Sequence, residues 1–324
     1  MSLAGCRCLV TGATGFIGFN LVRSLVKESA EVSCLVEPNV DTSRLVSLGA
    51  LSEIYVADLT DERAVRRILS GKKPSVVFHL AAVGTTDPAI DAVLAVKVNV
   101  EGTINLLLAL DGSFDFFVNT GTCHEYGSAP IPYRESLPPA PASVYAASKT
   151  AAWHFCNLFF NTKGWPIATL RLFTVYGPCQ SPKTLVPSVI LSALTEQELP
   201  MTSGDQVRDF VFVEDVVEGF LLAAKNPGCA GKTINLCCGH GASLRELVSK
   251  VEALVGQVPI KFGTLPHRQG EASQIIGDNS LARQLLGWEP KVTLEKGLAL
   301  TAEWFREAIR EGTIHRDSSG AMNG

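Results

Sequence analysis

A glycine-rich turn at residues 11–18, TGATGFIG, constrains the fold of this chain more than any other feature. It follows the apolar run CRCLV (6–10), which has the pattern of a buried strand, and it precedes a segment of helical apolar period. Between a strand and a helix, Gly12 permits a tight turn, Gly15 lets the backbone approach a pyrophosphate, and Gly18 lets the helix pack on the strand. The sequence therefore predicts a βαβ unit that binds a dinucleotide.

Short apolar runs then alternate with segments long enough to hold a crossover helix. This alternation predicts an α/β fold with a Rossmann-type, doubly wound parallel sheet. Right-handed crossovers place the carboxyl end of every strand at one edge of such a sheet. The chain has 324 residues, 46% of them hydrophobic, which is ample material for the core. The predicted strands are 6–10, 31–36, 53–57, 75–80, 114–119 and 166–172.

From about residue 180 the regular alternation weakens, and prolines interrupt the chain. We predict a Rossmann domain with the catalytic residues over 1–179 and a smaller substrate-binding lobe over 180–312, interleaved with the first. The polar segment 313–324 is expected to be a flexible tail. The lobe is expected to hold isolated strands within GDQVRDFVFVEDV and TINLCCG, and helices near 243–255 and 293–311.

The end of the second predicted strand, SCLVEPN, bears on which dinucleotide binds. Val36 stands where an acidic ribose ligand often lies, and Glu37 follows it. A carboxylate there accepts hydrogen bonds from the ribose hydroxyls and repels a 2′-phosphate. No Arg or Lys follows until Arg44. This pattern favours NAD over NADP, and Asp58 in VADLTD is expected at the adenine edge.

A tyrosine and a lysine in YAASK, Tyr145 and Lys149, begin a predicted helix after a proline-rich loop. Their spacing puts both side chains on one helix face. Because an ammonium stabilises a phenolate, we expect Lys149 to lower the pKa of Tyr145 from its usual value of about 10. Such a tyrosine exchanges a proton with a substrate hydroxyl near neutral pH. Thr122, after the fifth predicted strand, lies at the same sheet edge.

With these motifs the chain resembles the extended short-chain dehydrogenase/reductase superfamily, in its NAD-dependent epimerase/dehydratase branch, which modifies nucleotide sugars. The resemblance covers residues 7–310 and implies a catalytic tetrad of Asn99, Thr122, Tyr145 and Lys149. Thr122 would hold the substrate hydroxyl, Tyr145 would be the general base or acid, Lys149 would bind the nicotinamide ribose, and Asn99 would order a relay water. The matching segments are TGATGFIG, ADLTD, VVFHLAA, VNVEGT, YAASK, LRLFTVYGP, GDQVRDFVFVEDV and LLGWEPKVTLEKGL.

The resemblance also implies contacts to cofactor and substrate. Arg208, in VRDF, matches an arginine that grips a sugar-nucleotide diphosphate, a task that suits the guanidinium fork. Arg268, in HRQGE, matches a second residue near the nucleotide. Thr174 replaces an asparagine that many relatives place on the substrate phosphate, so the identity of the nucleotide stays open. The residues expected at the dinucleotide are Gly12, Thr14, Gly15, Phe16, Ile17, Gly18, Glu37, Asp58, Leu59, Leu80, Ala81 and Ala82, together with Tyr145 and Lys149.

The loop VNTGTCHEYG (118–127) bears on the reaction. The 4,6-dehydratases carry Asp-Glu where this chain has Cys123 and His124, which either replace that acid/base pair or only line the pocket. A 4-epimerase needs no acid pair there. Reductases of 4-keto-6-deoxy sugars need none either, and some share the E-Y-G ending and an IGDN-like segment (276–279).

The leading hypothesis is an NAD-dependent nucleotide-sugar epimerase that transfers hydride at sugar C4 through a 4-keto intermediate. The alternative is an NAD(P)H-dependent 4-keto-6-deoxysugar reductase, and a variant dehydratase that uses Cys123 and His124 ranks below it. A non-catalytic NAD-binding sensor is disfavoured, because the whole tetrad is present. The resemblance further implies a homodimer through helices near 93–110 and 145–160.

Charge, apolar runs and cysteines bear on the partners, the compartment and the metal content expected for the protein. The net charge of −4 and the pI of about 5.9, with no basic stripe, do not favour nucleic acid as a partner. Lys97 and Glu101 interrupt the most apolar helix candidate, so no membrane span is expected. Nine cysteines without a C-x-x-C pair or a signal peptide fit reduced thiols in the cytoplasm. Cys237, Cys238 and His240 are too closely spaced for a tetrahedral site, so no metal is expected.

Overall fold

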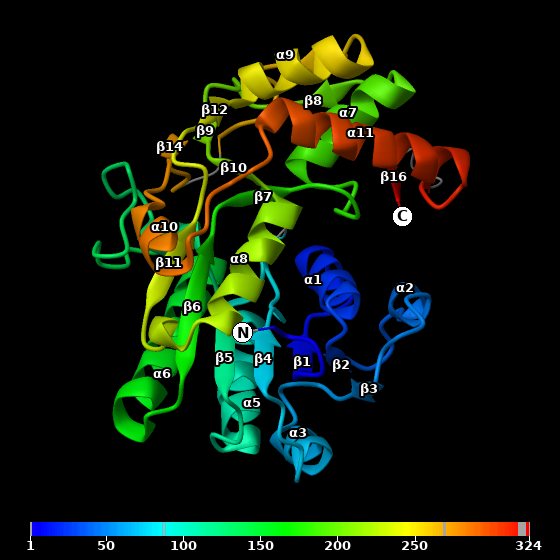
Figure 1. Cartoon of the computed structure of the whole chain (residues 1–324). Coiled ribbons are helices and arrows are strands. Elements are labelled where there is room, and N and C mark those ends of the chain that lie inside the picture. Colours follow the sequence, from blue (N-terminus) through cyan, green and yellow to red (C-terminus); the bar gives the residue numbers. More distant parts are fainter. Residues whose placement is uncertain (1, 86, 88, 268–269, 317–321, 324) are drawn as a thin grey trace.

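The fold is built around one parallel sheet. The computed structural model describes residues 2–85, 87, 89–267, 270–316 and 322–323, and within them a seven-stranded sheet has the order β11-β6-β5-β4-β1-β2-β3 (Figure 1). Every neighbouring pair is parallel. The strands are β1 (Arg7–Thr11), β2 (Glu31–Val36), β3 (Glu53–Val56), β4 (Val76–His79), β5 (Phe116–Thr122), β6 (Ile167–Leu172) and β11 (Thr233–Leu236). The prediction of a Rossmann-type fold is confirmed, and the chain order reverses between β1 and β4, where such sheets bind ligands.

The seventh strand corrects one expectation. TINL was expected to be an isolated strand of the smaller lobe, but β11 pairs with β6 from Thr233↔Thr169 to Leu236↔Leu172. Helix α8 (Val213–Lys225) precedes β11 and packs against β5 and β6, which makes it the crossover between parallel strands. A short apolar run does not reveal which sheet it joins.

Helices cover both faces of the sheet (Figure 1). Along β4, Val76 and Phe78 pack with α1 (Phe16–Lys27) and α8, whereas Val77 packs on the opposite face. That opposite face is covered by α3 (Glu62–Leu69), α5 (Gly102–Leu110) and α6 (Val144–Lys163). Strands buried on both faces explain the nearly continuous apolar runs in the sequence.

A continuous helical segment precedes β5. It consists of α4 (Ala92–Ala95), the π-helical turn η1 (Val96–Glu101) and α5. Among the described residues, this segment alone is long and apolar enough to cross a membrane, and 50% of the apolar window is buried inside the molecule. Helices in a protein core pass the same test. The π turn is the notable feature, because such turns often mark functional positions and this one contains Asn99.

The second lobe lies beyond the carboxyl ends of the strands (Figure 1). Its helices α7 (Leu185–Thr195), α9 (Leu244–Val255) and α11 (Leu294–Arg310) enclose a separate apolar cluster. Ile314 is buried in that cluster, so the second residue of the segment predicted as a tail is packed. The short strands are β7 (Thr174–Tyr176), β8 (Leu199–Pro200), β9 (Val207–Arg208), β10 (Phe210–Phe212), β12 (Ala242–Ser243), β13 (Ile260–Lys261), β14 (Gln274–Ile275), β15 (His315–Arg316) and β16 (Met322–Asn323). The remaining elements are α2 (Ser43–Val46), α10 (Ser280–Leu286) and the 3-10 turns η2 (Cys123–Tyr126) and η3 (Pro227–Cys229).

A buried aspartate joins the two parts of the chain. Asp209, between β9 and β10, accepts backbone N–H groups of Cys238 at 2.7 Å, Gly239 at 2.9 Å and Gly277 at 3.3 Å. Burial raises its pKa to about 6 although these hydrogen bonds lower it. Since Cys238 and Gly239 directly follow β11, the second lobe is tied to the carboxyl edge of the sheet.

Candidate functional site

The glycine turn forms a cradle at the amino end of α1. Gly12 has φ +67°, and a Cβ there would lie 2.6 Å from the Ala81 backbone nitrogen. A Cβ on Gly18 would lie 2.1 Å from the Gly12 carbonyl oxygen. Gly15 is the exposed N-cap residue, and α1, described in full, has neither a side-chain cap nor an acidic residue in its first turn. The free N–H groups and the positive end of the helix dipole suit a pyrophosphate.

The other residues predicted at the dinucleotide lie at the same edge of the sheet. Glu37 is exposed after β2. Thr14 lies in the turn before α1, Phe16 and Ile17 begin that helix, and all three are half-buried. Asp58 accepts hydrogen bonds from the Thr60 backbone and hydroxyl at 2.8 and 2.9 Å, so it also shapes the turn after β3. The half-buried residues 80–82 follow β4, and the buried Leu59 accepts a hydrogen bond from Asn105 at 2.9 Å. Their contacts to a dinucleotide stay predictions.

A buried hydrogen-bond chain connects the glycine turn to the predicted tetrad. Thr103 Oγ1 donates to the Asn99 carbonyl at 2.7 Å, so it accepts from His79 Nε2 at 2.8 Å. His79 Nδ1 then accepts from the Thr11 hydroxyl at 2.7 Å, and Thr11 Oγ1 in turn accepts the Ala81 N–H at 3.3 Å. Burial, with a smaller effect of the Lys149 charge, lowers the pKa of His79 to about 3. His79 is therefore neutral and holds the ends of β1 and β4 in register with η1.

The side chain of Asn99 fixes neighbouring segments. Its Nδ2 donates to the Val83 carbonyl at 3.0 Å and to Ser148 Oγ at 2.9 Å, while Oδ1 accepts the Val83 N–H at 2.8 Å. Asn99 thus ties the loop after β4 to α6. The amide oxygen keeps one lone pair for the predicted relay water, a role that stays a prediction.

Tyr145 and Thr122 meet at the end of β5. Helix α6 begins where Ser143 Oγ accepts the Ala146 N–H at 3.2 Å, which places Tyr145 in the first turn. Hydrogen bonds from Thr85 and Thr122 reach the Tyr145 hydroxyl. Sequence reasoning missed Thr85, which lies in the loop after β4 without any motif around it.

The expected pKa shift of Tyr145 is wrong in direction. Burial raises its pKa to about 12, although the hydrogen bonds from Thr85 and Thr122 lower it. Lys149 is 2% exposed, and burial lowers its own pKa while the charges of Glu125 and Cys156 raise it. The loss of hydration therefore outweighs any stabilisation of the phenolate by the ammonium.

A pocket of about 390 Å³ lies beside Tyr145. His124 is exposed and lines it, but Cys123 is 2% exposed, and burial raises the pKa of its thiol to about 12. Cys123 is therefore neither an acid facing the pocket nor part of its wall, which corrects its place among the candidates. The lining residues are Gly84, Thr85, Asp87, Ile90, His124, Gly127, Ala142, Ser143, Val144, Tyr145, Gly270, Glu271, Ala272 and Ile275.

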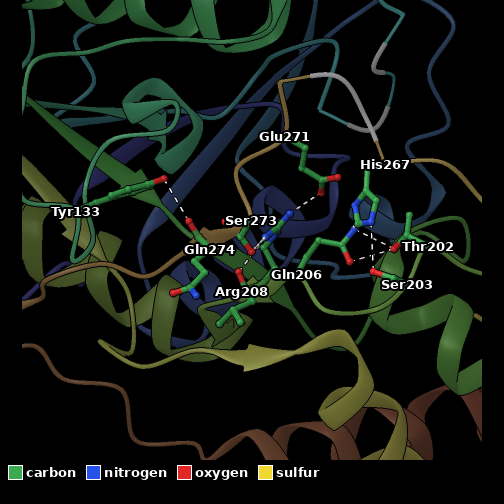
Figure 2. Close-up of polar contacts among 10 residues, drawn as sticks. Tyr133, Thr202, Ser203, Gln206, Arg208, His267, Glu271, Ser273 and Gln274 are labelled. Atoms are coloured by element: carbon green, nitrogen blue, oxygen red, sulfur yellow. Dashed lines mark hydrogen bonds and ion pairs between the residues drawn. The ribbon is translucent and has the colours of Figure 1, made fainter. Parts of the chain in front are cut away.

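Arg208 lies beside this pocket and is already paired. Figure 2 shows its guanidinium directed toward Glu271, with which it forms an ion pair, and it also donates to the carbonyls of Val207 and Ser273. Glu271 was not predicted, although it belongs to the quoted HRQGE segment. Thr174 lies in β7 and donates its backbone N–H to Asp209 O at 3.0 Å, next to Arg208. Arg268 lies outside the described residues.

A second polar cluster lies next to this ion pair (Figure 2). Gln206 Nε2 contacts His267 Nδ1 at 3.1 Å, and Ser203 Oγ contacts His267 Nε2 at 3.2 Å. Thr202 completes the cluster through two hydrogen bonds with Gln206 at 2.9 and 3.0 Å. These side chains offer both donors and acceptors beside Arg208.

The E-Y-G ending turns inward. Glu125 pairs with Arg171, and Tyr126 donates its hydroxyl to Asn235 Oδ1 at 2.8 Å. A Cβ on Gly127 would lie 1.9 Å from the Ala140 carbonyl oxygen. The three residues are thus required by packing, and their presence no longer separates a reductase from an epimerase.

Comparisons with known proteins agree with this fold and site. The model of the NAD dependent epimerase/dehydratase family matches residues 8–237. The chain is 35% identical to a UDP-glucose 4-epimerase of Mycolicibacterium smegmatis over 317 residues, 93% of this chain and 98% of the relative. It is 33% identical to a dTDP-glucose 4,6-dehydratase of Xanthomonas campestris over 352 residues, 97% and 98% of the two chains. The crystal structure of the UDP-glucose 4-epimerase of Thermus thermophilus in complex with NAD superimposes with a TM-score of 0.85 at 31% identity, and covers 93% of this chain and 99% of that one.

The chain belongs to the NAD-dependent epimerase/dehydratase family. It is therefore an enzyme, and the predictions of the family and of NAD as the cofactor are confirmed. The cradle formed by Gly12, Gly15 and Gly18 fits the pyrophosphate of that cofactor. Both a curated epimerase and a curated dehydratase match nearly the whole chain, so the comparisons alone do not select the reaction.

Two glycine substitutions should separate cofactor binding from folding. In Gly15→Ala the new Cβ has 3.3 Å to its nearest neighbour and φ is −72°, so the fold should persist while the methyl group crowds the pyrophosphate. We expect NAD affinity to fall about tenfold, which corresponds to about 1.4 kcal/mol, with a melting temperature that changes far less than in Gly18→Ala. In Gly18→Ala the Cβ meets a backbone oxygen, so the melting temperature itself should fall. Calorimetry and NAD titration test both variants, and equal behaviour of the two would contradict this assignment.

Proposed function

We propose that the protein is an NAD-dependent nucleotide-sugar 4-epimerase, which acts by hydride transfer at sugar C4 through a 4-keto intermediate. The observation that carries the proposal is the orientation of the loop 122–127, all of which is described. Its thiol, Cys123, is buried, and its carboxylate, Glu125, is 0% exposed and paired with Arg171. Only His124 of this loop's acid/base candidates lines the pocket. A 4,6-dehydratase would need an acid/base pair here, and inversion at C4 does not.

The relatives support a nucleotide-sugar substrate. The Mycolicibacterium smegmatis and Thermus thermophilus proteins are UDP-glucose 4-epimerases, and the Xanthomonas campestris protein is a dTDP-glucose 4,6-dehydratase. All act on a hexose attached to a nucleoside diphosphate. We infer that Arg208 exchanges its ion pair with Glu271 for the diphosphate of the substrate. A diphosphate carries more negative charge than the carboxylate that is paired with the guanidinium.

The tetrad performs the proton transfers in this proposal. NAD held at the glycine cradle would supply the hydride acceptor and donor for C4. The Tyr145 phenolate takes the C4 hydroxyl proton, becoming the phenol, and later returns that proton, while the Thr122 hydroxyl holds the same oxygen. Lys149 binds the nicotinamide ribose, and its ammonium stabilises the phenolate when the site is filled. Because burial raises the pKa of Tyr145 to about 12, this role requires a positive charge beside the phenolate, which we assign to Lys149.

Cofactor content and turnover test the proposal together. Freshly purified protein is denatured, released NAD⁺ and NADH are measured, and intact protein is incubated with UDP-, GDP-, CDP- and dTDP-hexoses. We expect bound NAD⁺, a product of unchanged mass and no net change in cofactor absorbance. Stoichiometric consumption of NAD(P)H with a 4-keto-6-deoxy sugar would instead identify the reductase.

Tyr145→Phe supplies the control for catalysis. Loss of the phenol should reduce kcat by about 10²–10⁴-fold, the usual contribution of a general acid–base group, with NAD still bound. The matched variant is Tyr55→Phe on β3, whose ring lies against Lys72, and it should turn over like the parent. An unchanged kcat of Tyr145→Phe would contradict the proton transfer assigned to Tyr145.

We also propose a homodimer through α4, η1 and α6. Exposed apolar side chains gather on these helices: Val93, Leu94, Val96, Val144 and Leu158. Their clustering is typical of an interaction surface, since a monomeric protein in water rarely exposes a contiguous apolar patch.

The dimer predicts a mass in solution. Light scattering should give twice the 34.6 kDa of the chain, and Val93→Glu with Leu158→Glu should give a monomer with an intact far-UV spectrum. The control is Leu254→Glu, an exposed residue of α9, which should stay dimeric. A monomeric parent protein would contradict the proposal.

A further inference from the structure

A fully buried ion pair lies directly behind the predicted catalytic residues. Glu125 belongs to η2 at the end of β5, and Arg171 belongs to the neighbouring strand β6. Their side chains are 0% and 1% exposed, and Arg171 Nε donates to Glu125 Oε2 at 2.8 Å. Neither residue lines the pocket. The ion pair therefore has no direct contact with a substrate there.

The second carboxylate oxygen of Glu125 holds the backbone of Thr122. Glu125 Oε1 accepts the Thr122 N–H at 2.8 Å, and Thr122 Oγ1 accepts the His124 N–H at 3.3 Å, so the two residues form a capping box. Since a lone pair of the Thr122 hydroxyl faces His124, its hydrogen is free to point to the Tyr145 hydroxyl, with which Thr122 is hydrogen-bonded. Glu125 thus sets the direction of the Thr122 hydroxyl.

A glycine makes room for this contact. A Cβ on Gly121 would lie 2.8 Å from Glu125 Oε1 and 3.1 Å from Arg171 Cγ. Any side chain at 121 would displace the carboxylate from the Thr122 N–H. The glycine of the TGT segment is explained by this close approach, and not by backbone conformation.

Two aromatic rings hold the Arg171 guanidinium. Its Cζ lies 4.5 Å from the ring centroid of Tyr126 and 4.9 Å from that of Trp153. Trp153 belongs to α6, one turn beyond Lys149, and donates its indole N–H to Thr233 at 2.7 Å. The ion pair consequently connects the end of β5, strand β6 and the helix that carries Tyr145 and Lys149.

The charge of Glu125 also reaches the tetrad. It raises the pKa of Tyr145 and opposes the lowering of the Lys149 pKa by burial. A buried ion pair of this kind adds little to stability, because an apolar pair of similar volume packs as well without the cost of desolvation. Since the stability of the fold does not require the Glu125–Arg171 ion pair, we look for its role in the position and the charge of the residues beside it.

We propose that the Glu125–Arg171 ion pair is a positioning element of the active site: Glu125 orients Thr122 and supplies the buried negative charge behind Tyr145 and Lys149, and Arg171 holds Glu125 in place. The inference rests on the proposed function only in that the reaction uses Thr122 and Tyr145.

The double variant Glu125→Leu/Arg171→Met separates positioning from folding. Since it leaves no unpaired buried charge, it should fold and bind NAD like the parent. We expect kcat to fall by roughly 10–100-fold with KM changed less than about threefold, because Thr122 loses its orientation while substrate binding remains. The control is Glu28→Leu/Lys225→Met, which removes a half-buried ion pair between α1 and α8 and should leave kcat unchanged. A folded Glu125→Leu/Arg171→Met variant with the kcat of the parent would overturn the positioning role.

A titration without turnover tests the electrostatic part. The protein has five tyrosines, so [ζ-¹³C]tyrosine NMR resolves each phenol, and Tyr145→Phe assigns the resonance of Tyr145. Glu125→Gln keeps an acceptor for the Thr122 N–H but removes the negative charge, so the Tyr145 pKa should fall below the parent value of about 12. If Glu125→Gln does not fold, the double variant is titrated, with the same expected direction. An unchanged Tyr145 pKa would overturn this part whether or not a nucleotide sugar is turned over.

Discussion

The close contact between the glycine turn and the end of β4 determines how the rest of the site is arranged. Gly12 lies so near the Ala81 backbone that no side chain fits, and this contact brings the carboxyl ends of β1 and β4 together at the switch point of the sheet. Thr11 and His79 lock the same two strand ends by a buried hydrogen bond. From His79 the chain of hydrogen bonds continues to Asn99 in η1. The glycine turn and Asn99, one residue of the predicted tetrad, thus belong to one polar network.

Burial determines the protonation states of the side chains in and beside this network. His79 stays neutral, the Cys123 thiol stays protonated, and the Tyr145 phenol resists ionisation, all because hydration is lost. Two charges act in the same direction as burial: Lys149 lowers the pKa of His79, and Glu125 raises the pKa of Cys123 and of Tyr145. A site of this kind is poised to respond to the binding of a charged cofactor, since few solvent dipoles screen the new charge.

Much of this arrangement was predictable from the sequence, for physical reasons. Strands buried on both faces give continuous apolar runs, so the strands up to residue 172 were predicted within about three residues at each end. The glycine motif indicated the cofactor edge and the helical spacing indicated the Tyr145–Lys149 pair, whereas the tetrad as a whole was implied by the resemblance to the family and stays a prediction. The directions of the side chains in the loop after β5 could not be predicted from the sequence. Cys123 and Glu125 face inward whereas His124 faces the pocket, and in a 3-10 turn side chains do not alternate between two faces as they do in a strand. The pairing of β11 with β6 and of Arg208 with Glu271 joins residues distant in sequence, which no local pattern reveals.

The central claim is that hydride leaves C4 and returns to C4 of the same sugar. The most direct measurement incubates the protein, without added cofactor, with nucleotide hexoses deuterated at C4 and analyses the product by mass spectrometry and NMR. The account predicts the C4 epimer, of unchanged mass and with deuterium still at C4. A product lighter by one water, or turnover only when NAD(P)H is added, would contradict it.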